Sequence, residues 1–192
     1  MQKIPFAPFI SLGMWLTFIF GSKFWLNIWL DFGYSIFLYG QPFRIVEAKS
    51  CGQFIKCFDS ELHVHKDKNR FSKGQTSSEF LRITLAPWIE QQADEYLLSR
   101  FNFWVDYLTI INVSCRLKWL SSRWGSCSLK RNINLNRCLL AAPVDVLDYV
   151  IVHELCHLQE MNHSKKFWKL VKAIMPDFKD KVHWLKKYYL VL

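Results

Sequence analysis

Two histidines four residues apart, with a glutamate directly after the first, are the residues best suited to chemistry in this chain. They are His153, Glu154 and His157. On an α-helix a separation of four residues places both imidazoles on one face, one turn apart, where they can bind a single Zn²⁺ ion. The glutamate between them can then reach a metal-bound water as general base. The pattern therefore predicts a site for one zinc ion, with Glu154 as the catalytic residue.

A zinc site of this kind needs a third protein ligand, and His163 is the first candidate. On an unbroken helix His163 would face away from His157, so the helix has to end between them. Asn162 tolerates the left-handed conformation that ends helices, and Ser164 can cap the next helix. A reversal at Asn162 would turn His163 back toward the metal. The alternative third ligands are Asp177, Asp180 and His183.

Apolar periodicity predicts the elements that position these side chains. A buried helix is expected over residues 144–161, followed by helices over 165–174 and 178–188. Residues 79–108 predict a long amphipathic helix or a pair, with Ile83 on the buried side. Pro87 should begin a new helix after a break at residues 84–86. Strands are expected at 37–46 around a turn at 40–42, in a hairpin over 51–65, and at 116–120 and 134–136.

Several short motifs occur in a fixed order around the histidines. They are Arg123-Trp-Gly-Ser-Cys127, Ile133-Asn-Leu-Asn136, Pro143, the segment from Tyr149 to His157, Asn162-His-Ser164 and Phe167-Trp168. Together they resemble the motifs of the YgjP-like metallopeptidases, which group with the WLM and SprT-like zinc-peptidase domains. The resemblance runs from about Phe37 to the C-terminus. It implies an α+β, zincin-like fold, in which a small, mainly antiparallel sheet packs on the helices that carry the HExxH site. It also implies His153, His157 and His163 as zinc ligands and Glu154 as catalytic base.

Other residues near these motifs are candidates for parts of the reaction. Arg123 and Tyr149 are candidates for stabilising the oxyanion. Arg123 suits a structural ion pair equally well, and Tyr149, one turn before His153, suits core packing or a hydrogen bond behind a ligand. An extended substrate commonly pairs with a sheet edge beside the metal. The predicted edge strand consists of Asn132, Ile133, Asn134, Leu135 and Asn136.

The predicted function is that of a zinc metallopeptidase, which hydrolyses peptide or protein substrates through a metal-bound water activated by Glu154. Two alternatives remain. The net charge of +9 gives some support to a DNA-associated protease like those of the SprT-like branch, although a solvated lysine-rich surface explains the charge as well. The second alternative is a zinc-binding domain without proteolytic activity, against which the intact Glu154 argues.

The first 36 residues depart from the family pattern. We therefore divide the chain into a hydrophobic extension, 1–36, and a metallopeptidase domain, 37–192. The stretch from Ile4 to Ser22 carries no charge over 19 residues, close to the length that spans a bilayer, although two prolines and a glycine dilute it. A membrane anchor is thus an alternative to a cytoplasmic location. The six cysteines favour the cytoplasm, because a chain of this size without a C-x-x-C motif more often keeps reduced thiols.

Overall fold

A computed structural model of the protein describes residues 35–48, 55–65 and 77–189. Its elements follow in the order β1 (Ser35–Leu38), β2 (Gln41–Ala48), β3 (Ile55–Phe58), β4 (Glu61–His65), α2 (Ser77–Tyr107), β5 (Ser114–Lys118), β6 (Gly125–Cys127), β7 (Asn132–Asn136), the 3₁₀ helix η2 (Arg137–Ala141), α3 (Val144–Cys156), α4 (Lys165–Ile174) and α5 (Phe178–Tyr189). This mixture of helices and small sheets confirms the predicted α+β class. The N-terminal segment considered as a membrane anchor lies outside the described residues, so the division at residue 36 stays a prediction.

The described strands form two small sheets rather than one. The first has the order β1-β2-β4-β3 and the second the order β5-β7-β6. Each contains one parallel pair, β2–β4 and β5–β7, and the remaining pairs are antiparallel. The predicted hairpin is present as the antiparallel pair β3–β4, and its turn consists of Asp59 and Ser60, both with positive φ. Strand β6 escaped prediction because Gly-Ser-Cys has no apolar alternation.

Helix α2 is continuous, so the predicted break at residues 84–86 is wrong. Pro87 lies inside the helix and is exposed. A proline costs one backbone hydrogen bond, but buried side chains continue at every fourth position on both sides of it. These are Leu81, Leu85, Ile89, Ala93, Leu97 and Phe101. Ile83, expected in the core, is 61% exposed because it lies off this row. Tertiary packing along one face therefore keeps the helix intact.

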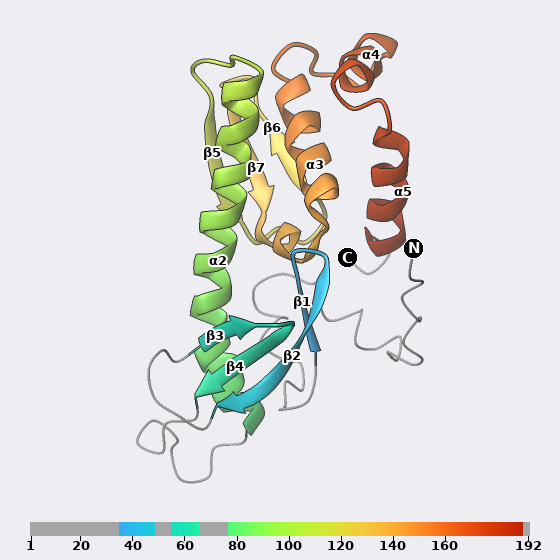
Figure 1. The fold of residues 1–192 in the computed structure, drawn as a ribbon. Coiled ribbons are helices and arrows are strands. Elements are labelled where there is room, and N and C mark those ends of the chain that lie inside the picture. Colours follow the sequence, from blue (N-terminus) through green and yellow to red (C-terminus); the bar gives the residue numbers. More distant parts are fainter. Residues whose placement is uncertain (1–34, 49–54, 66–76, 190–192) are drawn as a thin grey trace.

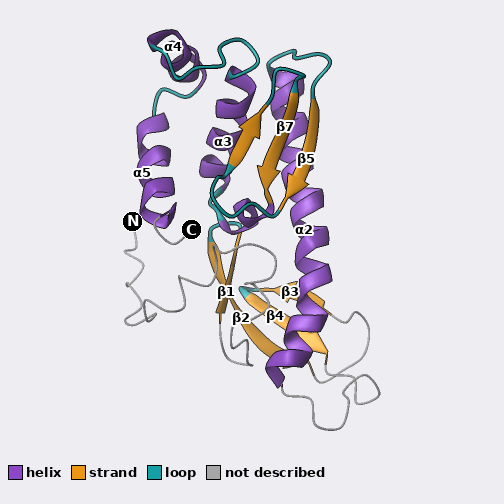
Figure 2. Ribbon diagram, turned by 180° about the vertical axis from the view of Figure 1, so that it is seen from behind, coloured by secondary structure: helices purple, strands orange, loops and turns teal. Residues whose placement is uncertain are grey.

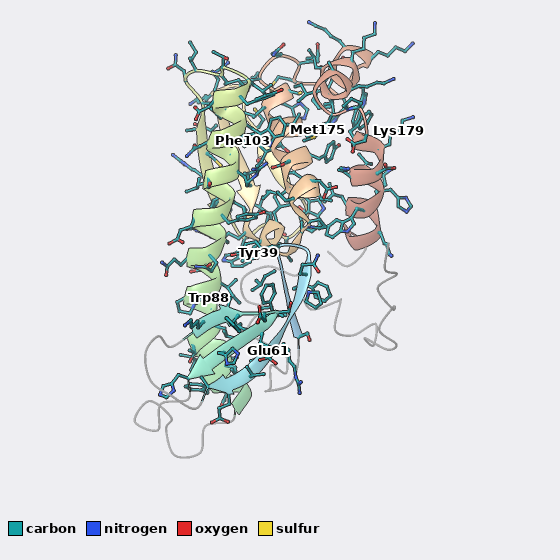
Figure 3. The ribbon with its side chains drawn as sticks, viewed as in Figure 1. Tyr39, Glu61, Trp88, Phe103, Met175 and Lys179 are labelled. Atoms are coloured by element: carbon teal, nitrogen blue, oxygen red, sulfur yellow. The ribbon has the colours of Figure 1, made fainter. Side chains whose placement is uncertain are left out.

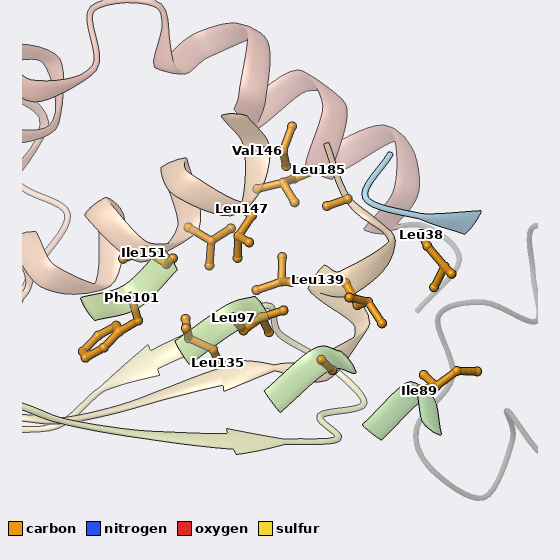
Figure 4. Packing of buried hydrophobic residues seen from close by; sticks show 14 of the residues in the cluster. Leu38, Ile89, Leu97, Phe101, Leu135, Leu139, Val146, Leu147, Ile151 and Leu185 are labelled. Carbon is orange, nitrogen blue, oxygen red and sulfur yellow. The ribbon is translucent and has the colours of Figure 1, made fainter. Parts of the chain in front are cut away.

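The second sheet and three helices enclose the part of the core that supports the site. Helices α2 and α3 cover the same face of the β5-β7-β6 sheet, and α5 lies on the far side of α3 from α2 (Figures 1 and 2). Leu135 of β7, Leu147 of α3 and Leu97 of α2 are fully buried between them (Figure 4). Apolar residues on β7 alternate, with Ile133 and Leu135 facing the helices. Helix α3 is thus held on several sides.

The turn between β1 and β2 joins the first sheet to the rest of the core. Tyr39 donates a backbone hydrogen bond to Leu140 (2.7 Å), and Gly40 donates one to Ala141 (3.1 Å), so the turn rests on η2 (Figure 3). Gly40 has φ of +77°, and an added Cβ would lie 2.8 Å from the Cα of Pro143. Glycine is required there both by conformation and by space. The contact fixes the start of α3.

Helix α3 ends at Cys156, five residues before the predicted end, whereas α4 has the predicted bounds. The early end matters for the site, because His157 and the residues up to Ser164 are released into a loop. Among the described residues, no helix combines the length and apolar character needed to cross a bilayer.

Candidate metal centre

The three histidines of the sequence prediction come together where α3 ends. His153 lies in the last turn of α3, His157 caps its end, and His163 lies in the loop just before α4. One ring nitrogen from each lies within 4.8 Å of the others. The Nε2 atoms of His153 and His163 are 2.9 Å apart. No other cluster of this kind was found among the described residues.

The chain reversal that brings His163 back differs from the prediction. Asn162 does not take the left-handed conformation. The reversal is spread over residues 157–163 and begins with two turns that close on the carbonyl of Cys156, which accepts from the amides of Gln159 and Glu160. Ser164 caps α4 as predicted, since its hydroxyl accepts a hydrogen bond from the amide of Phe167 (3.3 Å). The cap fixes the residue that follows His163.

Two of the imidazoles are oriented through their second nitrogen. Nδ1 of His153 lies 3.2 Å from the hydroxyl of Tyr149, and Nδ1 of His157 lies 3.0 Å from the carbonyl oxygen of Glu160. The carbonyl can only accept, so Nδ1 of His157 carries the proton and Nε2 is left free as a ligand. A metal ligand held in this way by its outer nitrogen is a common arrangement in metal sites. Tyr149 is 4% exposed, so it also packs in the core.

The ring of Phe167 packs against all three imidazoles of the histidine cluster. Its ring is stacked on His157, with centroids 4.5 Å apart, and meets His153 and His163 edge to face at 4.9 and 4.8 Å. The side chain is completely buried. Trp168 stacks on His163 from the next position of α4. In the sequence, Phe167-Trp168 is only one of the motifs that carry the family resemblance. In the structure, both rings pack against the imidazoles and restrict their orientation.

Glu154 follows His153 on α3 and lies against Gly125 of strand β6. It is 6% exposed, and its Oε2 is buried without a hydrogen-bond partner among the described residues. A buried carboxylate oxygen of this kind is expensive unless water, a proton or a cation satisfies it. Burial raises the pKa of Glu154 to about 8, while Arg123 lowers it. The oxygen is therefore a buried polar atom that a group from outside the chain, such as a water molecule or a cation, would satisfy.

The donor set suits a zinc ion. Three imidazoles with an open fourth position are a common set for catalytic zinc, and two ligands of a tetrahedral zinc lie about 3.3 Å apart. The 2.9 Å between His153 and His163 needs only a small opening to match. Burial, together with the smaller effect of the other two histidines, lowers the pKa of His153 to about 3. Burial also lowers the pKa of His157. Both rings are thus neutral at pH 7, as ligation requires.

The remaining predicted residues divide into those near the site and those away from it. Arg123 is exposed and forms no ion pair with an acidic side chain among the described residues. Its positive charge lowers the pKa of Glu154, against the larger effect of burial. The alternative ligands Asp177, Asp180 and His183 lie outside the histidine cluster. Asp177 instead accepts a hydrogen bond from Lys181 (2.7 Å).

The predicted edge strand is wrong. Residues Asn132–Asn136 form β7, which lies between β5 and β6 and is paired on both sides. A substrate strand cannot pair there because the backbone groups are already used. Strand β6, Gly125–Cys127, is the edge of the sheet nearest α3. The order was missed because the three residues of β6 gave no strand signal.

Asn136 has a structural role that the sequence did not reveal. Its side chain is fully buried and donates to the carbonyl oxygens of Leu120 (2.8 Å) and Arg123 (2.9 Å), while its oxygen accepts from the amide of Cys138 (3.1 Å). These bonds fix the loop that leads into β6. A polar residue at the end of an alternating strand was the only available signal.

Comparison with known proteins identifies one matching family and several similar solved structures. A family model described as the YgjP-like metallopeptidase domain matches residues 30–188. Among solved structures, the metallopeptidase zymogen jannalysin of Methanocaldococcus jannaschii is 22% identical, with a TM-score of 0.43, over 50% of this chain and 97% of that one. The zymogen abylysin of Pyrococcus abyssi is 23% identical, with a TM-score of 0.37, over 52% and 93%. No curated protein matches.

The family match covers most of the chain and includes all the residues of the histidine cluster. The family implies a divalent metal and peptide or protein substrates. The chain belongs to the YgjP-like metallopeptidase domain family, and the protein is a metallopeptidase.

Proposed function

We propose that this metallopeptidase binds one Zn²⁺ ion through His153, His157 and His163 and uses Glu154 as general base in peptide-bond hydrolysis. The observation that carries the proposal is the pairing of two features. Three imidazoles converge within 4.8 Å, and a buried carboxylate with an unpartnered oxygen follows the first of them in sequence. Ligands and base are thus supplied by one helix end and the loop that follows it.

The residues around the site have separate tasks. When bound, zinc would supply Lewis acidity that polarises the scissile carbonyl and makes water a better nucleophile at neutral pH. Glu154 takes the proton from the attacking water and delivers it to the leaving amine. Tyr149 and the carbonyl of Glu160 keep the rings of His153 and His157 in position. Burial favours the protonated form of Glu154, whereas the positive charge of Arg123, and that of a bound metal ion, would favour the charged form, which accepts a proton.

Strand β6 is the proposed place for the substrate backbone. On one side it pairs with β7, and no described strand pairs with the other side. Its residue Gly125 lies directly against Glu154. An extended peptide added to this edge would run past the base, and main-chain hydrogen bonds would hold it largely regardless of side chains. Side chains of the protein on the same face of the sheet as Gly125 would then contribute to substrate specificity.

We also propose a cytoplasmic location. The five described cysteines are free thiols, which suits a reducing compartment. Titration of free thiols in protein prepared without reductant checks this, because disulfides would lower the number found. No observation on the described residues favours nucleic-acid binding or membrane anchoring.

The test compares the wild type with Glu154→Gln against a quenched fluorogenic peptide library. Glutamine keeps the shape of the side chain but cannot accept the proton, so cleavage should fall about 10²–10⁴-fold. Zinc content and melting temperature should stay close to those of the wild type, because Glu154 is not a ligand. Wild-type cleavage by the variant would show that another base acts. Tight zinc binding with no cleavage by either protein would favour the zinc-binding domain without activity.

A further inference from the structure

Strand β6 packs against α3, and its residue Gly125 lies directly against Glu154 of that helix. Gly125 pairs with Leu135 of β7, and α3 packs against the strand at this point. A Cβ atom added to Gly125 would lie 2.7 Å from Oε1, 2.9 Å from Cγ and 3.0 Å from Cδ of Glu154. Outside their own residue and its two chain neighbours, real Cβ atoms essentially never come closer than 3.0 Å to a heavy atom. The three nearest atoms all belong to the side chain proposed as general base.

The backbone does not require a glycine at this position. Gly125 lies in a β-strand, and its φ is outside the left-handed range in which L-amino acids are strained. Most residues could adopt this conformation. Space, rather than backbone conformation, is therefore the reason for glycine here, in contrast to Gly40.

Glu154 has little room to give way. It is 6% exposed, and its neighbours on the helix, Leu155 and Cys156, are buried in the core. The clash would involve Cγ and Cδ as well as one oxygen, so turning the carboxylate group alone would not relieve it. The side chain would have to change its torsion angles near the helix, which would move the carboxylate away from its present position beside the histidines.

We infer that Gly125 is a positioning residue: the absence of a side chain leaves space for the carboxylate of Glu154 and so determines the position of the general base. This inference rests on the proposed function of Glu154. Gly125→Ala should reduce kcat about 10²-fold, since a misplacement of about 1 Å in a reacting group can cost this much. KM should change little, and zinc should bind as in the wild type, because none of the three nearest atoms belongs to a histidine.

The steric contact is tested first by stability, independently of activity. Gly125→Ala should lower the melting temperature of the EDTA-treated protein by about 3–10 °C, as overpacking of a core does. In combination with Glu154→Ala, which removes Cγ, Cδ and both oxygens, the same change should lower it by far less. Ser126→Ala is the matched control on the same strand: its hydroxyl accepts from Asn134 (3.0 Å), so its effect should be equal in both backgrounds.

The catalytic part uses the best-cleaved peptide of the fluorogenic library and a variant without the base. Glu154→Ala removes every atom that the new Cβ would meet, so adding Gly125→Ala to it should cost less than twofold further in the residual kcat instead of a second factor of about 10². Unchanged kcat in Gly125→Ala would overturn the inference, as would an equal melting-temperature loss with and without Glu154→Ala. A rise in KM at constant kcat would also overturn it, since it would mark Gly125 as a substrate contact. If Glu154→Gln cleaves normally, the proposed base is wrong, whereas the stability cycle still reports on the contact.

Discussion

Replacing Phe167 by alanine should weaken zinc binding although Phe167 is not a ligand. The ring contacts all three imidazoles, and it is completely buried. Without it, each imidazole regains rotamers that zinc binding must then freeze, at about 0.5–1.5 kcal/mol per side chain. Three rings give about 1.5–4.5 kcal/mol, so we expect zinc affinity to fall about 10²-fold. Removing a buried Phe side chain should in addition cost the fold about 3–5 kcal/mol.

The assay compares thermal or urea unfolding of Phe167→Ala and the wild type, each in EDTA and in buffered zinc. Zinc stabilises the folded state according to its free concentration relative to Kd, so a 10²-fold weaker Kd removes about 2.7 kcal/mol of that stabilisation. Val171→Ala is the control, because Val171 is equally buried one turn further along α4 but is not in ring contact with the histidines. It should lower stability and leave the zinc-dependent part unchanged. An unchanged zinc-dependent part in Phe167→Ala would refute the reasoning.

Three further changes follow from other contacts. Tyr149→Phe removes the hydroxyl 3.2 Å from Nδ1 of His153 and should weaken zinc about 10-fold in competition with a chromophoric chelator; equal affinity would mean that the bond does not hold the ring. Arg100→Met leaves the carboxylate of Asp148 without its two hydrogen bonds (2.9 and 2.5 Å) and should cost about 2–3 kcal/mol in urea unfolding, most of which Asp148→Leu should restore. In EDTA, the unfolded chain takes up a proton at His153 below pH 6.5, whereas burial keeps the folded-state pKa at about 3, so stability should fall as the pH falls. At pH 5 this amounts to about 2 kcal/mol, and the pH dependence should be weaker by that amount in His153→Asn; an identical dependence in both proteins would contradict it.

The sequence alone was sufficient to predict the site residues that are brought together by their spacing along one helix. His153, Glu154 and His157 share one helix, so helical periodicity alone places them together. His163 required the helix to end early and the chain to reverse, and the Ser164 cap was a readable signal for the second step. The supposed role of Asn162 was wrong because several turn hydrogen bonds, rather than one left-handed residue, make the reversal.

Features that depend on contacts between distant segments could not be read from the chain. The order β5-β7-β6 depends on a parallel pairing and on a three-residue strand, and neither leaves a periodic pattern. The continuity of α2 through Pro87 depends on core residues on both sides of it. Gly125 and Glu154 are 29 positions apart in the sequence and lie against each other only in the folded chain. The structure is therefore needed to show why position 125 is a glycine.

The most direct test of the three-histidine site is metal analysis of purified variants after mild chelation. The wild type should retain one zinc ion per chain, and His153→Ala, His157→Ala and His163→Ala should each lose it, because three protein ligands leave none in reserve. Asp180→Ala and His183→Ala should retain it as the wild type does, since neither residue belongs to the cluster. Retention of zinc by His163→Ala, together with its loss in His183→Ala or Asp180→Ala, would contradict the site described.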